Sequence, residues 1–401
     1  MAFTCKAVTL NCWGLPISWP VGTKHKYQRM NAIADKLNAG AYDIVALQEI
    51  WCPSDYEMIC SKTSVVYPYT FYFHSGVIGS GLCIFSKHPI FDTFMYRYTL
   101  NGYPHHIHRG DWLGGKIVGL AKIRFAGDIN VYVYCTHLHA QYGKSDIYRA
   151  HRTVQSFEIS QFVKQTATGA DLVLVMGDFN LEPDSLGYKL ILSIGELNDC
   201  WEVAESRPDG DCGFTSDTQR NSYTYPGLTA QRIDYICYKA YSGLEVSVNE
   251  CRTEFGTIPG TIISYSDHEA VAVILCMRKH DNHDALIPSS KSPFHSQISQ
   301  VDRSKVDLID ETITVIEPAI NRITYDRAIY IAWSVALMIV YLYTIDIEVH
   351  INVLALPMMG LRFMVVLVIG FCVLNGIISA TVEKNFLIAA RESIRVAKNH
   401  F

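Results

Sequence analysis

The hydrophobic positions of this chain follow two patterns, which divide it near residue 278. Before this point, short apolar runs alternate with segments of helical apolar spacing, which predicts an α/β or α+β domain over residues 1–278. The predicted strands are residues 7–11, 43–49, 81–85, 117–123, 129–136, 171–176, 232–237 and 270–277. The predicted helices are residues 27–37, 149–164 and 186–192. Most strands are continuous apolar runs, which is typical of sheets covered on both faces.

Residues 279–327 have a different composition from the domain before them. Their first part, up to residue 301, is rich in His, Ser, Asp and Pro and predicts a linker. Residues 306–320 space Ile, Leu and Val as an amphipathic helix does. Such a helix either lies on a membrane surface or simply connects two parts of the chain.

Two apolar stretches follow this linker region. Residues 328–345 and 363–382 contain no charged side chain. A hydrocarbon core of about 30 Å is crossed by roughly 20 helical residues, so both stretches are long enough to span it, the first with slight strain. We therefore predict transmembrane helices at residues 328–348 and 363–382, followed by a tail at 383–401. A pair of buried core helices is the alternative.

Basic residues around the two stretches predict their orientation. Arg322 and Arg327 precede the first stretch, and four more basic residues follow the second: Lys384, Arg391, Arg395 and Lys398. Because Lys and Arg accumulate on the cytosolic side of spans, both termini and the catalytic domain are expected in the cytosol. The modest span lengths favour a thin bilayer such as the endoplasmic reticulum membrane.

Polar side chains stand at or near the ends of the predicted strands, where open sheets usually place active sites. They are Asn11, Glu49, His137, Asp178, Asn180, Asp234, Asp267 and His268. Singly, an Asp or Asn at such a position is more often a turn former or a helix cap. Together, these residues supply oxygen ligands, amide donors and a histidine base, which indicates an enzyme active site.

This combination of side chains suits the hydrolysis of a phosphodiester. That reaction needs an attacking water, a proton acceptor and positive charge against the developing oxyanion. Mg²⁺ prefers oxygen ligands and uses one or two carboxylates, of which Glu49 is the best candidate. His268 suits the general base, because a histidine titrates near neutral pH. Either Asp234 or adjacent Asp267 could orient its ring, and their spacing does not decide between them.

Four motifs in this domain resemble the signatures of the endonuclease/exonuclease/phosphatase superfamily. They are Leu47-Gln48-Glu49, Gly177-Asp178-Phe179-Asn180, Arg232-Ile233-Asp234-Tyr235 and Ser266-Asp267-His268. The superfamily includes DNase I-like nucleases, inositol polyphosphate 5-phosphatases and neutral sphingomyelinases. The resemblance covers residues 4–277 and implies a DNase I-like fold, a four-layer sandwich of two β-sheets flanked by helices.

Three further segments resemble neutral sphingomyelinases of the sphingomyelin phosphodiesterase 2 type. They are residues 10–16, 111–119 and 136–142. The two C-terminal spans also resemble the form of that family with an N-terminal catalytic domain and a tail anchor. The resemblance implies Mg²⁺-dependent, phospholipase C-type hydrolysis of sphingomyelin at a membrane, which releases ceramide and phosphocholine.

The resemblance also implies roles for residues of this sequence. Glu49 would bind Mg²⁺ with Asn11 close by, and Asp267 would lie near the metal. His268 would act as general base and be oriented by Asp234.

For the remaining motif residues, the resemblance implies contacts with substrate and a conformational role. Asp178 and Asn180 would position the attacking water and the phosphate. His137 would hydrogen-bond the phosphate or assist the leaving group. Asp111 and Lys116 resemble a pair that acts as a conformational switch, although a solvated turn with a chance ion pair is the simpler interpretation of these two alone.

Other functions remain open on this sequence. A lyso-glycerophosphocholine would present the same choline phosphodiester at a membrane. A nuclease is disfavoured by the net charge of −5, because nucleic-acid binding favours a basic face, and an inositol phosphatase lacks a cluster of basic residues. An inactive membrane scaffold would not need the intact set of site residues.

Overall fold

The computed structural model describes residues 2–17, 22–106, 109–143, 145–241, 243–279, 303–345 and 352–399. The chain divides into two compact units. The larger unit is Met1–Asn101 with Arg109–Asp302, and the smaller is Gly102–His108 with Arg303–Phe401. Most of the predicted linker, residues 280–301, lies outside the described residues.

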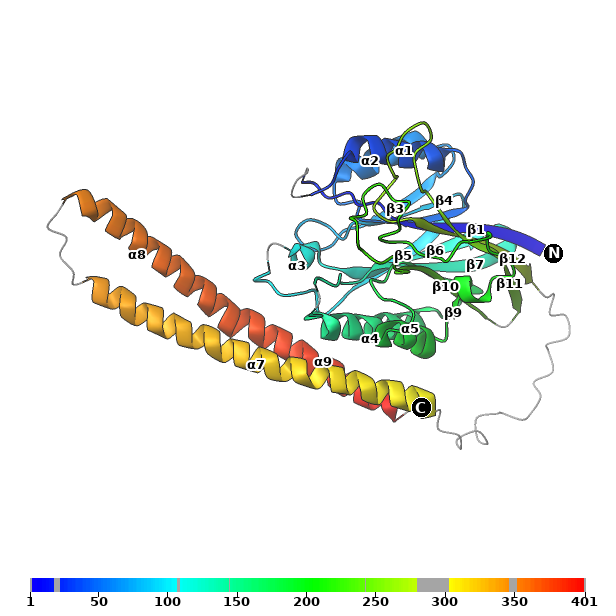
Figure 1. Cartoon of the computed structure of the whole chain (residues 1–401). Helices are drawn as coiled ribbons and strands as arrows, with labels where there is room; N and C mark the ends of the chain where they lie inside the picture. Colours follow the sequence, from blue (N-terminus) through cyan, green and yellow to red (C-terminus); the bar gives the residue numbers. More distant parts are fainter. Residues whose placement is uncertain are drawn as a thin grey trace. The chain divides into compact units, whose positions relative to one another are not determined.

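The first sheet of the larger unit consists of β1 (Ala2–Asn11), β2 (Ile44–Gln48), β3 (Tyr69–Phe73), β4 (Leu82–Ser86), β11 (Leu244–Glu254) and β12 (Ala270–Lys279). Their order across the sheet is β11-β12-β1-β2-β4-β3. Strand β1 runs parallel to β2 and antiparallel to β12. Helices α1 (Lys26–Asn38) and α2 (Pro53–Thr63) cover the outer face of this sheet (Figure 1).

The second sheet consists of β5 (Ile90–Arg97), β6 (Ile117–Phe125), β7 (Ile129–His137), β8 (Leu172–Asp178), β9 (Asn198–Asp199) and β10 (Asp234–Ala240). Their order is β5-β6-β7-β8-β10-β9. Helices α4 (Arg149–Thr166) and α5 (Leu186–Gly195) cover its outer face (Figure 1). Two short helices, α3 (Asp111–Gly114) and α6 (Cys200–Val203), and a 3-10 turn, η2 (Ala126–Asp128), lie in the connections.

Three groups of buried side chains hold the four layers together. The inner faces of both sheets share a central core, in which Ile44 and Ala46 of β2 pack with Val133 of β7. Two further cores lie under the helices on either side. Strand β8 is buried along its whole length, because helices cover one face and the other sheet covers the opposite face. The predicted four-layer sandwich is therefore confirmed.

The eight strands and three helices predicted for this domain are all present, with ends shifted by a few residues. The pattern missed strands β3, β5, β9 and β11 and helices α2, α3 and α6. Strand β5 lies at a sheet edge and no residue of it is fully buried, so its sequence lacks a strong apolar signal. Helix α2 has only two buried residues, Ile59 and Thr63.

The smaller unit is helical along its C-terminal part. It contains α7 (Arg303–Ile345), α8 (Asn352–Val373), the π-helical segment η4 (Leu374–Ser379) and α9 (Ala380–Lys398). Two stretches of these helices, Arg303–Ile345 and Ala355–Lys398, are long and apolar enough to cross a membrane, which supports membrane association. The long apolar helices expected from the sequence are therefore present, and residues 346–348 of the first predicted span lie outside the described residues.

The predicted amphipathic segment at residues 306–320 is the first part of α7 rather than a separate helix. Its apolar side chains Ile309, Ile316 and Ile320 are buried within the smaller unit. The oppositely charged side chains of α9 pair with it, as Arg391 does with Glu317 at 3.2 Å. This stretch of α7 therefore makes helix–helix contacts with α9.

Candidate active site

Strand pairing brings three of the predicted site residues side by side on the second sheet. On the parallel strands β7 and β8, His137 lies opposite Asp178. On the antiparallel strands β8 and β10, Asp178 lies opposite Asp234. Residues paired across neighbouring strands project from the same face of a sheet. The three side chains therefore form a row at one end of these strands.

The first sheet supplies the other residues of the site. Asn11 ends β1 and lies opposite Gln48 of the parallel strand β2, so Glu49 follows directly beside it. Asp267 and His268 immediately precede β12, which pairs with the other edge of β1. The strand order thus gathers residues that are far apart in the sequence.

The Asn11 side chain joins the two sheets at the site. Its Nδ2 atom donates to Oε1 of Glu49 at 3.0 Å and to Oδ2 of Asp178 at 3.0 Å. Its Oδ1 atom accepts from the backbone N–H of Trp13 at 3.0 Å. Asn11 therefore bridges two carboxylates through its nitrogen, and its oxygen keeps a second lone pair.

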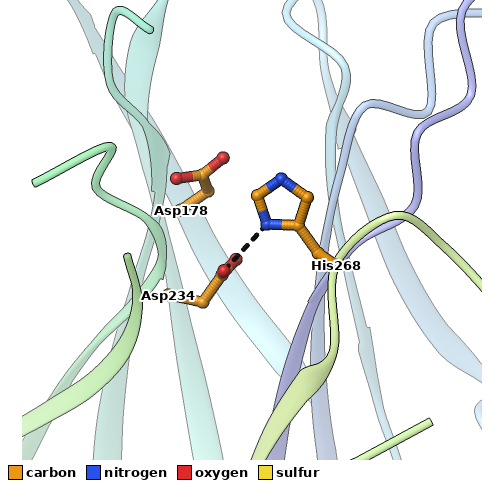
Figure 2. Close-up of side chains that lie close together, drawn as sticks. All are labelled: Asp178, Asp234 and His268. Carbon is orange, nitrogen blue, oxygen red and sulfur yellow. Dashed lines mark hydrogen bonds and ion pairs between the residues drawn. The ribbon is translucent and has the colours of Figure 1, made fainter. Parts of the chain in front are cut away.

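His268 and Asp234 form a close pair, shown in Figure 2. The Nδ1 atom of His268 lies 2.9 Å from Oδ2 of Asp234, and the other ring nitrogen points away from that carboxylate. The Asp234 side chain is fully buried, and 11% of the His268 side chain is exposed. Asp267 instead accepts a hydrogen bond from Ser266 Oγ at 3.2 Å. Of the two carboxylates left open by the sequence, Asp234 is the one that lies against the imidazole.

Asp178 is fixed by hydrogen bonds from both sides. The backbone N–H of Asn180 donates to its Oδ1 at 2.8 Å, while Asn11 donates to its Oδ2. Asn180 also donates through its side chain to the carbonyl of Leu138 at 3.1 Å. The Nε2 atom of His137 lies 3.5 Å from Oδ2 of Asp178. The structure thus places Asp178, Asn180 and His137 in one connected group.

Two residues of the site have a left-handed backbone, which side chains rarely adopt. Glu49 has a φ of 59° and Asn180 a φ of 50°. Such conformations cost on the order of 1–3 kcal/mol and persist only where the surroundings enforce them. Around Glu49, the backbone N–H of Gly14 donates to the Glu49 carbonyl at 3.0 Å. The backbone therefore holds the Glu49 side chain in a defined direction.

The site carries more negative than positive charge. Burial and the neighbouring charge of Asp234 raise the pKa of Asp178 to about 7. Burial also raises the pKa of Asp267 to about 6. For His268, burial lowers the pKa, but the carboxylates of Asp234, Asp178 and Asp267 together raise it well above its ordinary value. Crowded carboxylates of this kind favour a bound cation, which would lower the pKa of His268 again.

One group of the described residues offers converging ligand atoms to a metal ion. Ligand atoms of Asp178, Asp234 and His268 lie within 4.8 Å of one another, although Nδ1 of His268 already contacts Asp234. Glu49 and Asp267 bring two further carboxylates to the site, and the charge of Glu49 contributes to the raised pKa of Asp267. Two carboxylates that repel each other provide the hard oxygen donors that Mg²⁺ prefers. The role of Glu49 as a metal ligand stays a prediction, because the described group with converging ligand atoms does not include it.

Asp111 and Lys116 form a buried ion pair near the site. Oδ1 of Asp111 lies 3.1 Å from Nζ of Lys116, and both side chains are at most 7% exposed. The sequence did not single out Tyr142, whose hydroxyl donates to Oδ2 of Asp111 at 2.6 Å. Nε2 of His139, a residue to which the sequence assigned no role, lies 3.8 Å from the same oxygen. The segment that carries His137 also contains both residues, so proximity in sequence was their only signal.

Sequence comparison with known proteins places this chain in a family. The sequence profile of the Endonuclease/Exonuclease/phosphatase family matches residues 8–268. A Caenorhabditis elegans protein named "Putative neutral sphingomyelinase" is 38% identical, over 98% of this chain and 91% of its own length. Human "Sphingomyelin phosphodiesterase 2" is 40% identical, over 67% of this chain and 64% of its own length. A Schizosaccharomyces pombe "Inositol phosphosphingolipids phospholipase C" is 32% identical, over 68% of both.

Solved structures share the fold of the larger unit. A beta toxin from Staphylococcus aureus superposes with a TM-score of 0.54 at 22% identity, over 67% of this chain and 99% of its own. TDP2 from Caenorhabditis elegans gives a TM-score of 0.52 at 21% identity, over 68% of this chain and 75% of its own. The two-sheet architecture is thus one that distant sequences also adopt.

Proposed function

Because this chain belongs to the endonuclease/exonuclease/phosphatase family and to its neutral sphingomyelinases, we propose that it hydrolyses sphingomyelin to ceramide and phosphocholine with Mg²⁺ as cofactor. The family and its relatives make the chain a phosphodiesterase. The observation that carries the proposed mechanism is the 2.9 Å contact between His268 Nδ1 and Asp234 Oδ2.

His268 is the proposed general base. Its Nδ1 atom is engaged by Asp234, so Nε2 is the nitrogen that can accept a proton from water. The water oxygen then bonds to phosphorus, and the bond from phosphorus to the ceramide oxygen breaks. The leaving ceramide oxygen takes up one proton from solvent, phosphocholine retains the oxygen of the water, and the His268 imidazolium releases its proton to solvent. The Asp234 carboxylate stabilises the imidazolium that forms during this transfer.

Three residues of the second sheet and its loops hold the reactants in the proposed mechanism. Asp178 and Asn180 orient the water and the phosphate, since the backbone N–H of Asn180 donates to Oδ1 of Asp178. His137 donates a hydrogen bond to a phosphate oxygen. Burial and the charge of Lys116 lower the pKa of His137 well below its ordinary value, so it does so as a neutral imidazole.

Glu49 is the proposed principal Mg²⁺ ligand, with Asn11 and Asp267 beside it. When bound, the cation supplies positive charge against the oxyanion of the pentacoordinate phosphorus. Glu49 is suited to this task because Asn11 and Trp51 donate to its two carboxylate oxygens at 3.0 Å and 3.4 Å and so orient it. Asp111 and Lys116 are proposed to change their pairing during the reaction, since their ion pair is buried near His137.

The membrane arrangement is also a proposal. We place the catalytic domain at residues 1–278, the spans at 328–348 and 363–382, and the tail at 383–401. Basic residues flank the helical pair on the side of the termini, which supports a cytosolic catalytic domain. The endoplasmic reticulum is favoured because the apolar stretches are short. No nucleic-acid partner is expected.

An inositol phosphosphingolipid is a second candidate substrate. The Schizosaccharomyces pombe relative carries that substrate in its name and is 32% identical to this chain. The reaction would be the same, with inositol phosphate in place of phosphocholine as the product.

A headgroup-release assay tests the proposed function. The purified full chain in detergent would be given sphingomyelin, lysophosphatidylcholine, an inositol phosphosphingolipid and supercoiled DNA, each with Mg²⁺ or with EDTA. We expect rapid release of phosphocholine from sphingomyelin with Mg²⁺ only, and its loss in His268→Ala. Faster cleavage of DNA or of the inositol lipid than of sphingomyelin would contradict the proposed substrate, and full activity in EDTA would contradict the metal.

A further inference from the structure

Arg29 is a fully buried arginine on helix α1 of the larger unit. The other large side chains on the buried face of this helix, Met30, Ile33 and Leu37, are apolar. Moving a guanidinium out of water costs several kcal/mol, so an apolar side chain would stabilise the fold better if packing were the only requirement. The contacts of the guanidinium therefore indicate what Arg29 contributes.

The guanidinium of Arg29 donates all five of its N–H groups to atoms of nearby loops. Its acceptors are the backbone carbonyls of Lys24 at 2.9 Å, Cys12 at 2.8 Å, Trp13 at 2.7 Å and Tyr265 at 3.2 Å, and the hydroxyl of Thr23. These donors lie in one rigid plane and are the full set that an arginine side chain has. Arg29 therefore satisfies every donor within the protein and has none left for a ligand.

The hydrogen bonds of Arg29 join the two loops that carry Asn11 and His268. Two of its acceptors directly follow Asn11 in the sequence, and Tyr265 directly precedes Ser266. The Oγ atom of Ser266 donates to the carbonyl of Asn11 at 2.6 Å and accepts from the backbone N–H of His268 at 3.3 Å. The two loops therefore meet at Ser266, and Arg29 fixes the backbone of each loop beside this junction.

The backbone of Trp13 depends on the same hydrogen bonds. Its φ of 48° is left-handed, which costs on the order of 1–3 kcal/mol and persists only where the surroundings enforce it. The carbonyl of Trp13 accepts from Arg29, and its N–H donates to Oδ1 of Asn11 at 3.0 Å. Asn11 in turn donates to the carboxylates of Glu49 and Asp178. Loss of Arg29 would therefore release the backbone on which the orientation of Asn11 depends.

From these contacts we propose that Arg29 is a positioning residue, which holds the loops of Asn11 and His268 in the relative position that phosphodiester hydrolysis requires. The inference rests on the proposed function, because that function assigns the reaction to these loops. Arg29 acts through the backbone of both loops, since it is buried and its donors are all engaged. The sequence did not single it out, because an arginine on a helix is usually exposed.

Arg29→Lys separates the hydrogen bonds from the charge. Lysine keeps the charge, but its three donors radiate from one atom and do not match five acceptors spread around a plane. In the full chain in detergent, we expect kcat for sphingomyelin to fall about 100-fold, as a displacement of about 1 Å predicts, and KM to change by less than about twofold. Arg29→Gln, which avoids burying a charge, should show the same split if the lysine variant does not fold. Wild-type kcat in either variant would overturn the proposal.

Leu37→Ala is the matched control for stability, since Leu37 is buried on the same helix. Loss of a buried leucine costs about 2–5 kcal/mol without removing a hydrogen bond to either loop. Measured at a temperature at which all variants are folded, Leu37→Ala should keep the kcat of wild type. An equal fall of kcat in Leu37→Ala and Arg29→Lys would show that Arg29 contributes stability alone, and would overturn the proposal.

Hydrogen exchange of the backbone amides provides a readout without turnover. In Arg29→Lys, residues 12–14 and 264–268 should exchange faster than in wild type, whereas β8 should exchange at the wild-type rate. Wild-type exchange in both loops would overturn the proposal whether or not sphingomyelin is the substrate. Failure of the proposed function would appear separately, as a wild-type chain that releases no phosphocholine from sphingomyelin but whose two loops still respond to Arg29→Lys.

Discussion

The Nδ1 atom of His268 lies 2.9 Å from Oδ2 of Asp234, and the two residues belong to different sheets. His268 precedes β12 of the first sheet, and Asp234 begins β10 of the second. The pair forms only when both sheets are packed face to face. Correct assembly of the sandwich is therefore a condition for activity of the proposed base.

His268→Ala should lower kcat by about 10²–10⁴-fold, which is the usual contribution of a general base. Asp234→Asn should also lower kcat, because an amide neither stabilises the imidazolium nor selects the same tautomer. Both values would come from phosphocholine release by the full chain in detergent.

His74→Ala is a suitable control for this pair, since His74 is exposed on the surface of the same domain. Near-wild-type turnover by His268→Ala would remove His268 from the mechanism. Normal turnover by Asp234→Asn would instead assign the orienting role to another group.

Glu49→Gln should lower activity at saturating Mg²⁺ by at least about 100-fold, because it removes one charged oxygen donor from the metal site. A second readout does not depend on turnover. A ligand that binds only the folded state raises its stability, so Mg²⁺ should raise the Tm of wild type and have less effect on the Tm of Glu49→Gln. Glu57→Gln, at an exposed position of α2, provides the control. An equal Mg²⁺-induced Tm shift in both variants would contradict the assignment of Glu49.

The fold was predictable from the sequence where elements are buried on both sides. Strand β8 is buried throughout, and its sequence is a nearly continuous apolar run. Its position therefore followed from the pattern of apolar residues alone. Strand β5 was not predictable, because its edge position leaves most residues partly or fully exposed. The pairing of β1 with β12 joins the two ends of the domain, and no local pattern specifies such a contact.

The sequence predicted which strand ends carry residues of the candidate site, but not which of these residues contact one another. The positions of Glu49 and Asp178 followed from polar residues placed after apolar runs. The choice between Asp234 and Asp267 required the packing of two sheets, which spacing does not contain. Tyr142 was signalled only by its proximity in sequence to His137, because 24 tyrosines occur in this sequence and only the folded chain shows that this one donates to Asp111.

Glu158 should make stability depend on pH. Burial raises the pKa of its carboxyl to about 7, from an ordinary value near 4.5. Between these values the folded state binds more protons than the unfolded state, so stability falls as pH rises from about 4.5 to 7. The extra stability at low pH is present in full below the unfolded pKa and is lost as pH rises through the folded pKa. It amounts to about 3 kcal/mol. Glu158→Gln should therefore show a smaller fall in Tm between pH 5 and pH 8 than wild type.

The Tm values would be measured on the full chain in detergent. Active-site carboxylates also titrate in this range, but they are common to both proteins and cancel in the comparison. Glu57→Gln should keep the wild-type dependence. Identical pH dependence in Glu158→Gln and wild type would mean that the Glu158 carboxyl is not perturbed by folding.

Removing residues 303–401 should release the catalytic domain from membranes. Cutting at residue 323 instead would keep the first part of α7, whose side chains Ile309, Ile316 and Ile320 are buried within the helical unit and would become exposed. We therefore expect the shorter fragment to remain in the supernatant after a salt wash, and the fragment of residues 1–322 to pellet in part. Sedimentation with vesicles measures both. A pelleting shorter fragment would reveal a second membrane-binding surface in the catalytic domain.

Gly14→Ala should impair the metal site although it substitutes none of the proposed ligands. A Cβ atom at Gly14 would lie 2.3 Å from the backbone carbonyl oxygen of Glu49, so the Glu49 segment must move. Misplacing a catalytic group by about 1 Å costs on the order of 100-fold in rate. We expect a fall of this size in kcat, together with weaker stabilisation of the fold by Mg²⁺. Gly256→Ala is the matched control, because no atom lies within 4 Å of the added methyl group. Normal kcat and a normal response of Tm to Mg²⁺ in Gly14→Ala would show that the position of the Glu49 backbone does not control the metal site.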